Sequence, residues 1–365
     1  MLCINDYEAY AKEHLDEKAW AFYSQGAERE ETLQENLRAY TRYTLVPRML
    51  INVDERDLST TILGYRISMP VGLAPTGFQK MAHPDGELAA SRAAEEIGTV
   101  YTLSTVANTS LEDVANYCNP RSHPLFMQIY MVNDKSTNED LIRKAEASGY
   151  KAIVLTIDAP VLGLQLRMGQ TGRLQLPPHL STPNVTVDSI QQVKDTENLS
   201  DSHFAKKLLA YDVKWEDITW IKSITNLPIV LKGILTVEDA KKAVIYGASA
   251  VWISNHGGRE LDGVSATIDS LSEISTALKE SNCEMYVDGG VRWGSDILKA
   301  LALGARVVFI GRPVIWGLAH SGQEGVRNAL EILKSELDRA MHLIGCRSVG
   351  DIGSHFVQKK CFCKI

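Results

Sequence analysis

PIVLKGILTVEDAKKAVIYGASAVWISNHGG, residues 228–258, contains a complete strand–helix–strand unit. The runs PIVLKGI (228–234) and AVWISNHG (250–257) are nearly continuous in apolar residues. This pattern is typical of parallel strands that are buried on both faces. Between the runs lies TVEDAKKAVIYGA (236–248), which has an amphipathic helical pattern and a glycine near its end, a common helix stop. The stretch therefore predicts two parallel strands joined by a helix.

The same unit recurs along the chain. Six further strand-length apolar runs are MPVGLAP (69–75), VYTLST (100–105), LFMQIYM (125–131), AIVLTIDA (152–159), MYVDGGV (285–291) and VVFIGRP (307–313). Eight strand–helix repeats predict an α/β fold, a (β/α)8 TIM barrel rather than an open sheet. We expect a single domain over residues 1–365. Residues 1–63 would form a helical N-terminal extension, and residues 160–213, too long for an ordinary connection, a lid after the fourth strand.

Composition restricts the class of partner. The chain has 365 residues, of which 45% are hydrophobic and 23% charged, and its formal net charge is −7 without a Lys/Arg block. These values argue against a nucleic-acid partner. The longest apolar runs are interrupted and too short to cross a bilayer, so we expect no membrane partner. The six cysteines lack metal-ligand spacing, and we expect no metal site.

Two weak signals concern localisation. The tail Cys363-Lys364-Ile365 resembles a relaxed peroxisomal address, and the N-terminus lacks the basic and apolar regions of a secretory signal. We therefore expect a peroxisomal protein. Glycosylation sequons at Asn108, Asn184 and Asn198 keep a secreted form open as the alternative.

Polar residues gather where the predicted strands end, which is the functional rim of a (β/α)8 barrel. A structural core would not place so many polar groups at one rim, and they therefore predict a ligand site. In chain order they are Thr76, Ser104, Gln128, Tyr130, Thr156, Asp158, Lys232, Ser254, His256, Arg259, Asp288, Arg292 and Arg312.

The last two strand ends indicate a phosphate site. VDGGVRWGSD carries Gly289, Gly290 and Arg292, and IGRPVIWG carries Gly311 and Arg312. Glycines let main-chain N–H groups approach an anion, helix N-termini favour negative charge, and arginine matches phosphate oxygens. Barrels often bind phosphate between the seventh and eighth strands. The alternative is two surface turns with solvated arginines.

Lys232 and His256 are candidates for the chemistry itself. A lysine inside an apolar strand needs a partner. Either Lys232 pairs with Asp158 or Asp288, or it places a cation beside an electron-poor ring or forms a Schiff base. A histidine at a strand end with a carboxylate to orient it, here Asp158, is a general-base arrangement. The alternative for His256 is a lone core histidine.

Together these motifs resemble a known family. SNHGGRELDG (254–263), LPIVLKGIL (227–235) and GRPVIWGLA (311–319) are similar to the FMN-dependent α-hydroxy acid oxidases of the glycolate and long-chain hydroxy acid oxidase type, across nearly the whole chain. The resemblance implies FMN at the mouth of the barrel. The cofactor contacts that it implies are Pro75, Thr76, Gly77, Ser104, Gln128, Thr156, Lys232, Ser254, Asp288, Gly289, Gly290, Arg292, Gly311 and Arg312.

The resemblance also implies roles for catalytic residues. Lys232 would stabilise the anionic reduced flavin, and His256 would take a proton from the substrate while Asp158 stabilises the imidazolium. Tyr130 would belong to the catalytic set and, with Arg259, hold the substrate. The α-carbon hydrogen would pass to the flavin, giving a 2-oxo product, and O2 would be reduced to H2O2. Relatives imply a homo-oligomer, a tetramer by analogy.

Three positions depart from the family pattern. Gln165 stands where the family usually has a substrate-side arginine, Phe22 where a tyrosine often binds the carboxylate, and Val106 where a tryptophan is common. We expect these residues to bind the substrate, and we expect an (S)-2-hydroxy acid with an apolar side chain. The alternative is a carboxylate-free α-hydroxynitrile such as mandelonitrile, giving an acyl cyanide. A flavin-binding scaffold without turnover and a dehydrogenase with another electron acceptor are further readings.

Overall fold

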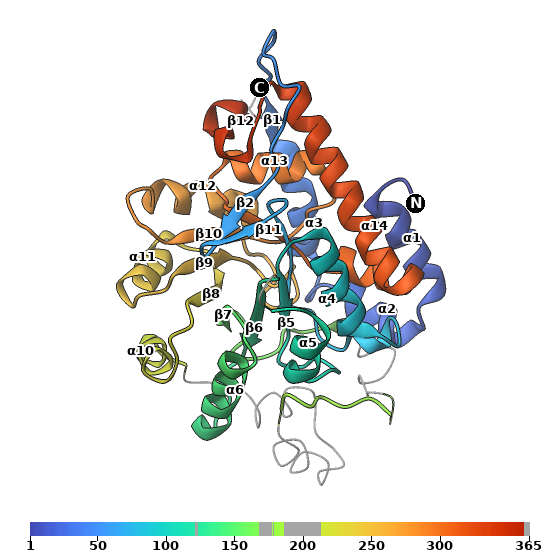
Figure 1. The fold of residues 1–365 in the computed structure, drawn as a ribbon, viewed down its shortest axis with the longest axis vertical. Coiled ribbons are helices and arrows are strands. Elements are labelled where there is room, and N and C mark those ends of the chain that lie inside the picture. The colour runs from blue at the N-terminus through green and yellow to red at the C-terminus, as the bar shows by residue number, and fades with distance from the viewer. Residues whose placement is uncertain (121–122, 168–176, 178, 186–212, 361–365) are drawn as a thin grey trace.

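Eight parallel strands close into a barrel in the order β10-β11-β4-β5-β6-β7-β8-β9 (Figure 1). The computed structural model describes residues 1–120, 123–167, 177, 179–185 and 213–360. The strands are β4 (Val71–Leu73), β5 (Tyr101–Leu103), β6 (Leu125–Ile129), β7 (Ala152–Thr156), β8 (Ile229–Ile234), β9 (Ala250–Ile253), β10 (Glu284–Val287) and β11 (Val307–Ile310). The predicted (β/α)8 barrel is confirmed.

Several of the predicted strands extended too far at their C-terminal ends. The run 250–257 is a strand only over Ala250–Ile253, and the run 285–291 only up to Val287. The backbone turns into the left-handed region soon afterwards, with φ values of 55° at His256 and 98° at Gly289. A chain in that conformation cannot continue a strand. The polar residues predicted on these strand ends therefore lie largely in the loops that follow.

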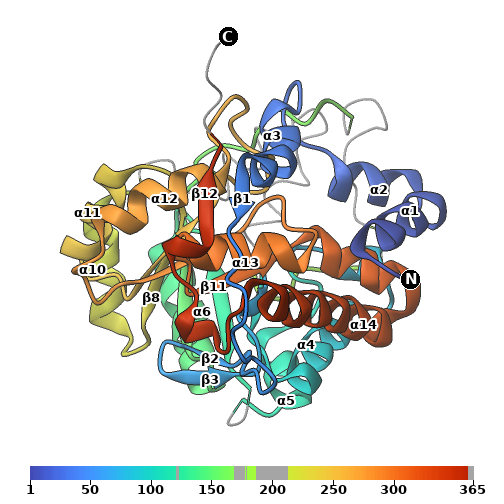
Figure 2. The same ribbon diagram turned by 90° about the horizontal axis from the view of Figure 1, so that it is seen from above.

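Helices surround the barrel (Figure 2). Several begin at a side chain that accepts a main-chain N–H, such as Ser110 from Asp113 and Thr236 from Asp239. The last helix is long because two helical segments meet at a kink at Ser321 and Gly322. The helices are α4 (Gly86–Ile97), α5 (Leu111–Tyr117), α6 (Lys135–Ala147), α10 (Trp215–Ile224), α11 (Val237–Ile245), α12 (Thr267–Ala277), α13 (Gly294–Ala302) and α14 (Arg312–Ile344).

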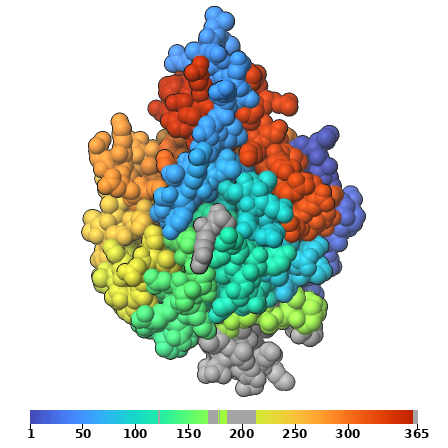
Figure 3. Space-filling model, in the orientation of Figure 1, coloured from blue at the N-terminus to red at the C-terminus, as the bar shows by residue number. Residues whose placement is uncertain are grey.

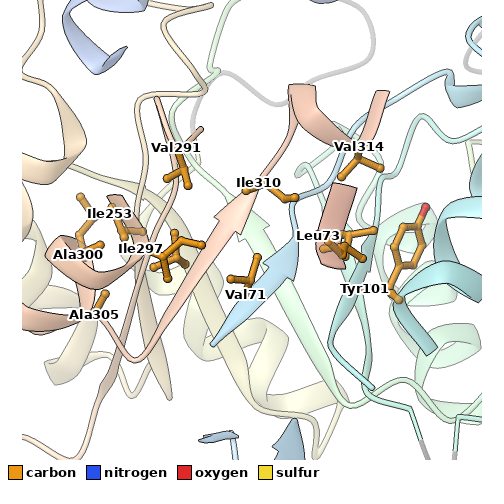
Figure 4. Close-up of a cluster of buried hydrophobic side chains, with 14 of the residues drawn as sticks. Val71, Leu73, Tyr101, Ile253, Val291, Ile297, Ala300, Ala305, Ile310 and Val314 are labelled. Carbon is orange, nitrogen blue, oxygen red and sulfur yellow. The ribbon is translucent and has the colours of Figure 1, made fainter. Parts of the chain in front are cut away.

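The strands separate two apolar clusters. Every second strand residue faces the helices, as Val71, Leu73, Ile253 and Ile310 do (Figure 4). The alternate residues fill the barrel interior, where the rings of Trp252 and Phe309 stack with centroids 3.8 Å apart. The barrel is therefore a packed core and not a pore. A ligand has to bind above this core, at one end of the strands.

The N-terminal extension is helical only in its first part. It forms α1 (Ile4–His14), α2 (Glu17–Ser24), α3 (Glu31–Ala39) and the short helix η1 (Tyr40–Arg42). The remaining prediction for residues 43–63 was wrong. The strand β1 (Tyr43–Leu45) pairs with β12 (Val357–Lys359), and β2 (Thr60–Ile62) forms a hairpin with β3 (Tyr65–Ile67). Figure 3 shows this arm running from the apex of the molecule onto the barrel.

Only parts of the predicted lid, residues 160–213, lie among the described residues. The Asn184 side chain accepts the N–H of Leu111 at 2.8 Å and donates to the Thr109 carbonyl at 3.0 Å. Val185 packs against Val132 beyond β6. These contacts place residues 179–185 beside the loop that follows β5. No helix among the described residues is long and apolar enough to cross a membrane.

Candidate active site

The inward-facing side chains change from apolar to polar near the C-terminal end of the barrel. Side chains alternate along a strand, so residues two apart share a face. The buried apolar residues Phe126, Val154, Val230, Trp252 and Tyr286 are each followed, two positions later, by a polar residue. These polar residues are Gln128, Thr156, Lys232, Ser254 and Asp288, all of them buried. The predicted site residues therefore meet directly on top of the packed interior.

Lys232 is the central cation of this layer. Its side chain is only 4% exposed, and Nζ donates to Ser254 Oγ at 3.1 Å. Carboxylate oxygens of Asp158 and Asp288 each lie 3.9 Å from Nζ. The predicted ion pair is thus present with both partners. Two buried carboxylates around one ammonium leave an excess of negative charge, which favours a ligand with donors or an electron-poor ring.

Asp158 and Asp288 respond differently to Lys232. Burial raises the pKa of Asp288, and the attraction of Lys232 does not fully offset it. At Asp158 burial also opposes ionisation, but Lys232 and His256 outweigh it and lower the pKa. Asp158 is therefore the carboxylate that stays ionised beside His256. Asp288 accepts hydrogen bonds from Ser254 Oγ at 2.8 Å and from Trp252 Nε1 at 2.9 Å.

His256 is oriented by Asp158. The distance from His256 Nδ1 to Asp158 Oδ1 is 2.9 Å, and the main-chain N–H of His256 donates to Ser254 Oγ at 3.1 Å. The residue has a φ of 55°, a conformation that costs energy outside glycine, and such strain clusters at functional sites. The imidazole is 21% exposed. The carboxylate at Nδ1 leaves Nε2 to face a substrate, as a general base requires.

Arg259, which is predicted to bind the substrate, contacts the N-terminal extension. Arg259 Nη1 donates to the Phe22 carbonyl at 2.5 Å, and the guanidinium carbon lies 4.9 Å from the centre of the Phe22 ring. Tyr130 shares the electrostatic environment of Arg259, and burial followed by Glu260 and Asp158 raises its pKa. Helix α2 therefore brings Phe22 to Arg259, so these two predicted substrate residues lie together.

Gln165 and Val106 have defined neighbours. Gln165 Oε1 accepts a hydrogen bond from Gln25 Nε2 at 3.2 Å, which turns it towards the extension. Val106 packs against Val132 and Val185. It also lies so close to Gly77 that a Cβ added there would be 2.6 Å from Val106 Cγ2. Val106 therefore joins the loops after β4 and β5 to the described part of the predicted lid.

The loops after β10 and β11 have the features of an anion site. Gly289 and Gly290 have φ values of 98° and 78°, and a Cβ at Gly290 would lie 2.0 Å from the Asn36 carbonyl oxygen. Arg292 is buried, and its Nε lies 3.5 Å from Glu8 Oε2, a long ion pair that makes no hydrogen bond. Its guanidinium therefore keeps N–H donors that a ligand could accept from. A Cβ at Gly311, which precedes α14, would make ordinary contact with Thr76 Cγ2 at 3.7 Å.

Arg312 has a role that the sequence did not predict. Its guanidinium donates to the carbonyls of Tyr23 at 2.8 Å, Gln25 at 2.7 Å and Gly257 at 3.0 Å. Burial, together with the positive charges of Arg259 and Arg292, lowers its pKa to about 9. Arg312 therefore fastens the extension to the loop that carries His256. A guanidinium has five N–H donors, so the predicted phosphate contact stays a prediction for the remaining ones.

The other predicted cofactor residues lie at the C-terminal ends of β4 to β7. Thr76 Oγ1 accepts from Gln79 Nε2 at 2.7 Å, next to Pro75. Ser104 Oγ accepts the N–H of Val106 at 3.3 Å. Gln128 Nε2 donates to Thr156 Oγ1 at 3.1 Å. Hydroxyl and amide groups are thus presented by the loops after β4 and β5 and by the last residues of β6 and β7, where Thr156 pairs in register with Lys232 of β8.

The comparisons with known proteins agree with this arrangement. Residues 11–359 match the family model described as FMN-dependent dehydrogenase. The chain belongs to this family. It is 46% identical to human 2-hydroxyacid oxidase 1 over 98% of this chain and 97% of that protein. It is 43% identical to glycolate oxidase of Spinacia oleracea over 96% of this chain and 93% of the relative.

Solved structures of mandelate oxidase are also similar. The structure with (S)-4-hydroxymandelic acid has a TM-score of 0.91, is 38% identical and covers 99% of each chain. The predicted resemblance and the FMN cofactor are confirmed. The chain is an FMN-dependent oxidoreductase of the hydroxy acid oxidase type.

The residues present fit FMN. The buried Arg292 guanidinium, which meets Glu8 only at 3.5 Å, suits a phosphate, and Lys232 suits the electron-poor edge of a flavin. Among the described residues there is no group of three or more His, Cys, Asp or Glu side chains that could hold a metal.

Two residues at this rim escaped the sequence analysis. Glu260 follows Arg259 directly, and its Oε2 accepts the N–H of Gly163 at 2.7 Å. The Gln25 side chain contacts Gln165, and its carbonyl accepts from Arg312. The signal for Glu260 was a carboxylate inside the motif that carries His256 and Arg259. Gln25 carried no local signal, because only the folded extension brings it to the barrel.

Proposed function

We propose that this protein oxidises (S)-2-hydroxy acids with an apolar side chain to 2-oxo acids and reduces O2 to H2O2. When bound, FMN supplies the two-electron acceptor and passes the electrons to O2. The observation that carries the chemistry is the His256–Asp158 pair, with 2.9 Å between Nδ1 and Oδ1, beside the buried Lys232. His256 takes the proton from the substrate hydroxyl at Nε2, and ionised Asp158 stabilises the imidazolium that results.

The positive charge of Arg259 is an argument for a substrate with a carboxylate. The Phe22 ring is an argument for an apolar substrate side chain. Phe22 has no hydroxyl to offer a carboxylate, and its ring lies against the Arg259 guanidinium. Gln165 contributes no charge and is engaged by Gln25. A site with an arginine at position 165 and a tyrosine at position 22 would offer two more groups to the substrate carboxylate than this site does. Affinity then has to come from apolar burial of the substrate side chain.

Anaerobic bleaching of the bound flavin tests the proposal. Glycolate, lactate, a long-chain 2-hydroxy acid, mandelate and mandelonitrile are mixed separately with the holoenzyme, and flavin absorbance is followed. We expect the long-chain acid and mandelate to bleach fastest. Fastest bleaching by glycolate would show that the substrate side chain is small. No bleaching by any acid would overturn the hydroxy acid proposal.

The second candidate is a neutral α-hydroxy compound such as mandelonitrile. The neutral Gln165 favours it, and an arginine-to-leucine variant of mandelate oxidase has been solved with 2-hydroxy-phenylacetamide, which carries no carboxylate. Arg259 is compatible with both candidates because it can stabilise either a carboxylate or an alkoxide. Rapid bleaching by mandelonitrile with slow bleaching by the acids would favour this second function.

We also propose a peroxisomal location and a homotetramer. The tail Cys363-Lys364-Ile365 lies outside the described residues. Asn108 Nδ2 donates to the Ser181 carbonyl at 2.9 Å and Asn184 Nδ2 to Thr109, so a glycan at either amide would compete with a contact of the fold. This disfavours the use of two of the three sequons; Asn198 lies outside the described residues. Imaging of a tagged chain with and without its last three residues tests the address, and light scattering tests the tetramer.

A further inference from the structure

Phe78 is a half-buried aromatic residue in the loop after β4. Its ring meets the ring of Phe22 in an edge-to-face arrangement, with the centroids 5.5 Å apart and the planes at 60°. The Phe22 ring also contacts the Arg259 guanidinium, whose carbon lies 4.9 Å from the ring centre. One phenyl ring therefore connects the cation that is predicted to bind a carboxylate with a second phenyl ring.

The position of Phe78 is fixed by its main chain. Its carbonyl accepts a hydrogen bond from the Tyr23 hydroxyl at 2.6 Å, and its N–H donates to the Val106 carbonyl at 3.2 Å. Tyr23 lies on α2, next to Phe22, and Val106 is itself a predicted substrate residue. Residue 78 therefore lies between the two segments that carry these predicted substrate positions, and these two hydrogen bonds do not depend on its side chain.

The backbone of Phe78 is strained. Its φ of 58° and ψ of 35° lie in the left-handed region, where a bulky residue is unusual and glycine would cost less energy. The Phe78 ring belongs to none of the three apolar clusters of the described residues, whereas Phe22 packs against the main one. Among the described residues, core packing therefore does not account for a phenyl ring here, and such strain clusters at functional sites.

We propose that Phe78 determines which apolar side chain the substrate carries, and that it selects an aryl group over an aliphatic one. Phe22 and Phe78 together form an aromatic corner, in which an aryl ring can stack on one ring and meet the other edge-on, the arrangements that aromatic pairs prefer. Arg259 holds the carboxylate of the same substrate. The inference rests on the proposed function and deepens it, because it names the class of side chain.

Phenylacetate and cyclohexylacetate test this inference, because both carry a carboxylate and a six-membered ring, but only one ring is aromatic. Neither has a hydroxyl group to oxidise. Calorimetry measures the dissociation constant of each ligand from the holoenzyme. We expect the wild type to bind phenylacetate more tightly. In Phe78→Leu the ratio of the two constants should shift by about two- to tenfold towards cyclohexylacetate, which is the size of an aromatic-pair contribution.

Control variants separate recognition from folding. Leucine at position 78 is unbranched at Cβ, as phenylalanine is, so it adds no strain at the left-handed backbone and keeps the main-chain hydrogen bonds. Phe78→Tyr retains the ring and should retain the preference for phenylacetate. Tyr65→Leu removes an aromatic ring from β3, at the other end of the barrel, and should leave the ratio unchanged. A merely structural role of Phe78 would weaken both ligands equally.

Three results would overturn the inference: tighter binding of cyclohexylacetate by the wild type, an unchanged ratio in Phe78→Leu, or binding of neither ligand. A shift of equal size in Phe78→Leu and Phe78→Tyr would also contradict it, because the tyrosine variant keeps the ring. Failure of the proposed function is a separate observation, since it appears as an absence of flavin bleaching by 2-hydroxy acids and does not depend on these dissociation constants.

Discussion

The two ends of the barrel treat their carboxylates in opposite ways. At the end where the strands begin, the hairpin β2–β3 covers Glu284, whose carboxylate accepts the Leu63 N–H at 3.1 Å and the Tyr286 hydroxyl at 2.7 Å. At the end where the strands finish, Asp158 Oδ2 is buried with no hydrogen-bond partner among the described residues. Lys232 lies 3.9 Å from two carboxylates, too far for a tight ion pair.

This difference indicates that the carboxylate at the start of the strands serves stability, whereas the charged groups at the end of the strands serve the reaction. A carboxylate satisfied by neutral donors holds a loop in place and has no need to change. Buried charges with incomplete partners cost stability, and such groups are retained where a ligand or a reaction uses them. We therefore expect substitutions at the strand finish to change activity strongly and those at the strand start to change stability weakly.

His256→Asn should give the largest effect. The substitution removes the general base, while asparagine tolerates the left-handed backbone at this position. We expect the rate of anaerobic flavin reduction to fall by about 10²- to 10⁴-fold with little change in melting temperature. Stopped-flow absorbance measures the rate. Reduction within tenfold of the wild type would remove His256 from the proposed chemistry.

Lys232→Met should be the most destabilising change at this rim. Loss of the ammonium leaves Asp158 and Asp288 facing each other without a cation, which typically costs about 3–5 kcal/mol. Urea unfolding followed by circular dichroism measures the free energy. Lys241→Met, on the exposed side of α11 (Val237–Ile245), is the control and should change it little. Equal stability of the two variants would mean that Lys232 does not offset the carboxylates.

Gln165→Arg tests whether residue 165 decides between anionic and neutral substrates at the C-terminal end of the barrel. A second cation should improve binding of small 2-hydroxy acids by about 1.5–3 kcal/mol, since hydrogen bonds to charged groups contribute about that much. The ratio of kcat/KM for lactate to that for mandelonitrile should rise accordingly. Gln165→Met, which removes the amide and adds no charge, is the control. An unchanged ratio in the arginine variant would show that position 165 does not face the substrate.

Glu260→Gln tests how much a buried carboxylate destabilises the fold, through the dependence of stability on pH. A carboxyl group whose pKa is raised on folding contributes fully to stability at a pH below its pKa in the unfolded chain. This contribution is lost as the pH rises through its pKa in the folded protein. The pKa of Glu260 is raised from 4.5, chiefly by burial. The variant should therefore melt above the wild type near pH 8 and equal it near pH 4. Differential scanning calorimetry measures both; a difference that grows towards low pH would contradict the assignment.

Glu284→Gln should give the smallest effect. Glutamine keeps an oxygen for Leu63 but weakens a charge-assisted bond, so we expect a loss of about 1 kcal/mol or less and unchanged flavin reduction. A large fall in the rate of flavin reduction would contradict the assignment of stability to one end of the barrel and of chemistry to the other. Thermal melts and stopped-flow traces on the same preparation measure both quantities.

The local pattern predicted the barrel and most of its rim. The unit at residues 228–258 folds as β8, α11 and β9, and its polar residues Lys232, Ser254 and His256 meet at one end. Strand ends were less predictable. The run 250–257 reads as one strand, but the left-handed backbone at His256 ends the pairing earlier. The residues themselves were correctly placed at the rim, although they lie in loops.

Contacts between distant segments were not predicted. The strand β1 pairs with β12 across more than three hundred residues, Arg312 binds carbonyls of the N-terminal extension, and Glu260 receives the Gly163 N–H. None of these partners lies within one strand–helix unit. A three-residue segment such as Tyr43–Leu45 becomes a strand only when its partner is beside it.

The sequence by itself determined the barrel, the inward polar layer, the family and the flavin. Side-chain alternation along a strand has a period of two, so local order decides which residues face the interior. Only the tertiary structure decided that Phe22 underlies Arg259, that Gln165 turns to Gln25 and that Glu260 accepts the Gly163 N–H. These contacts depend on how separate loops pack and on how strongly burial disfavours their charges, and neither is encoded within a single segment.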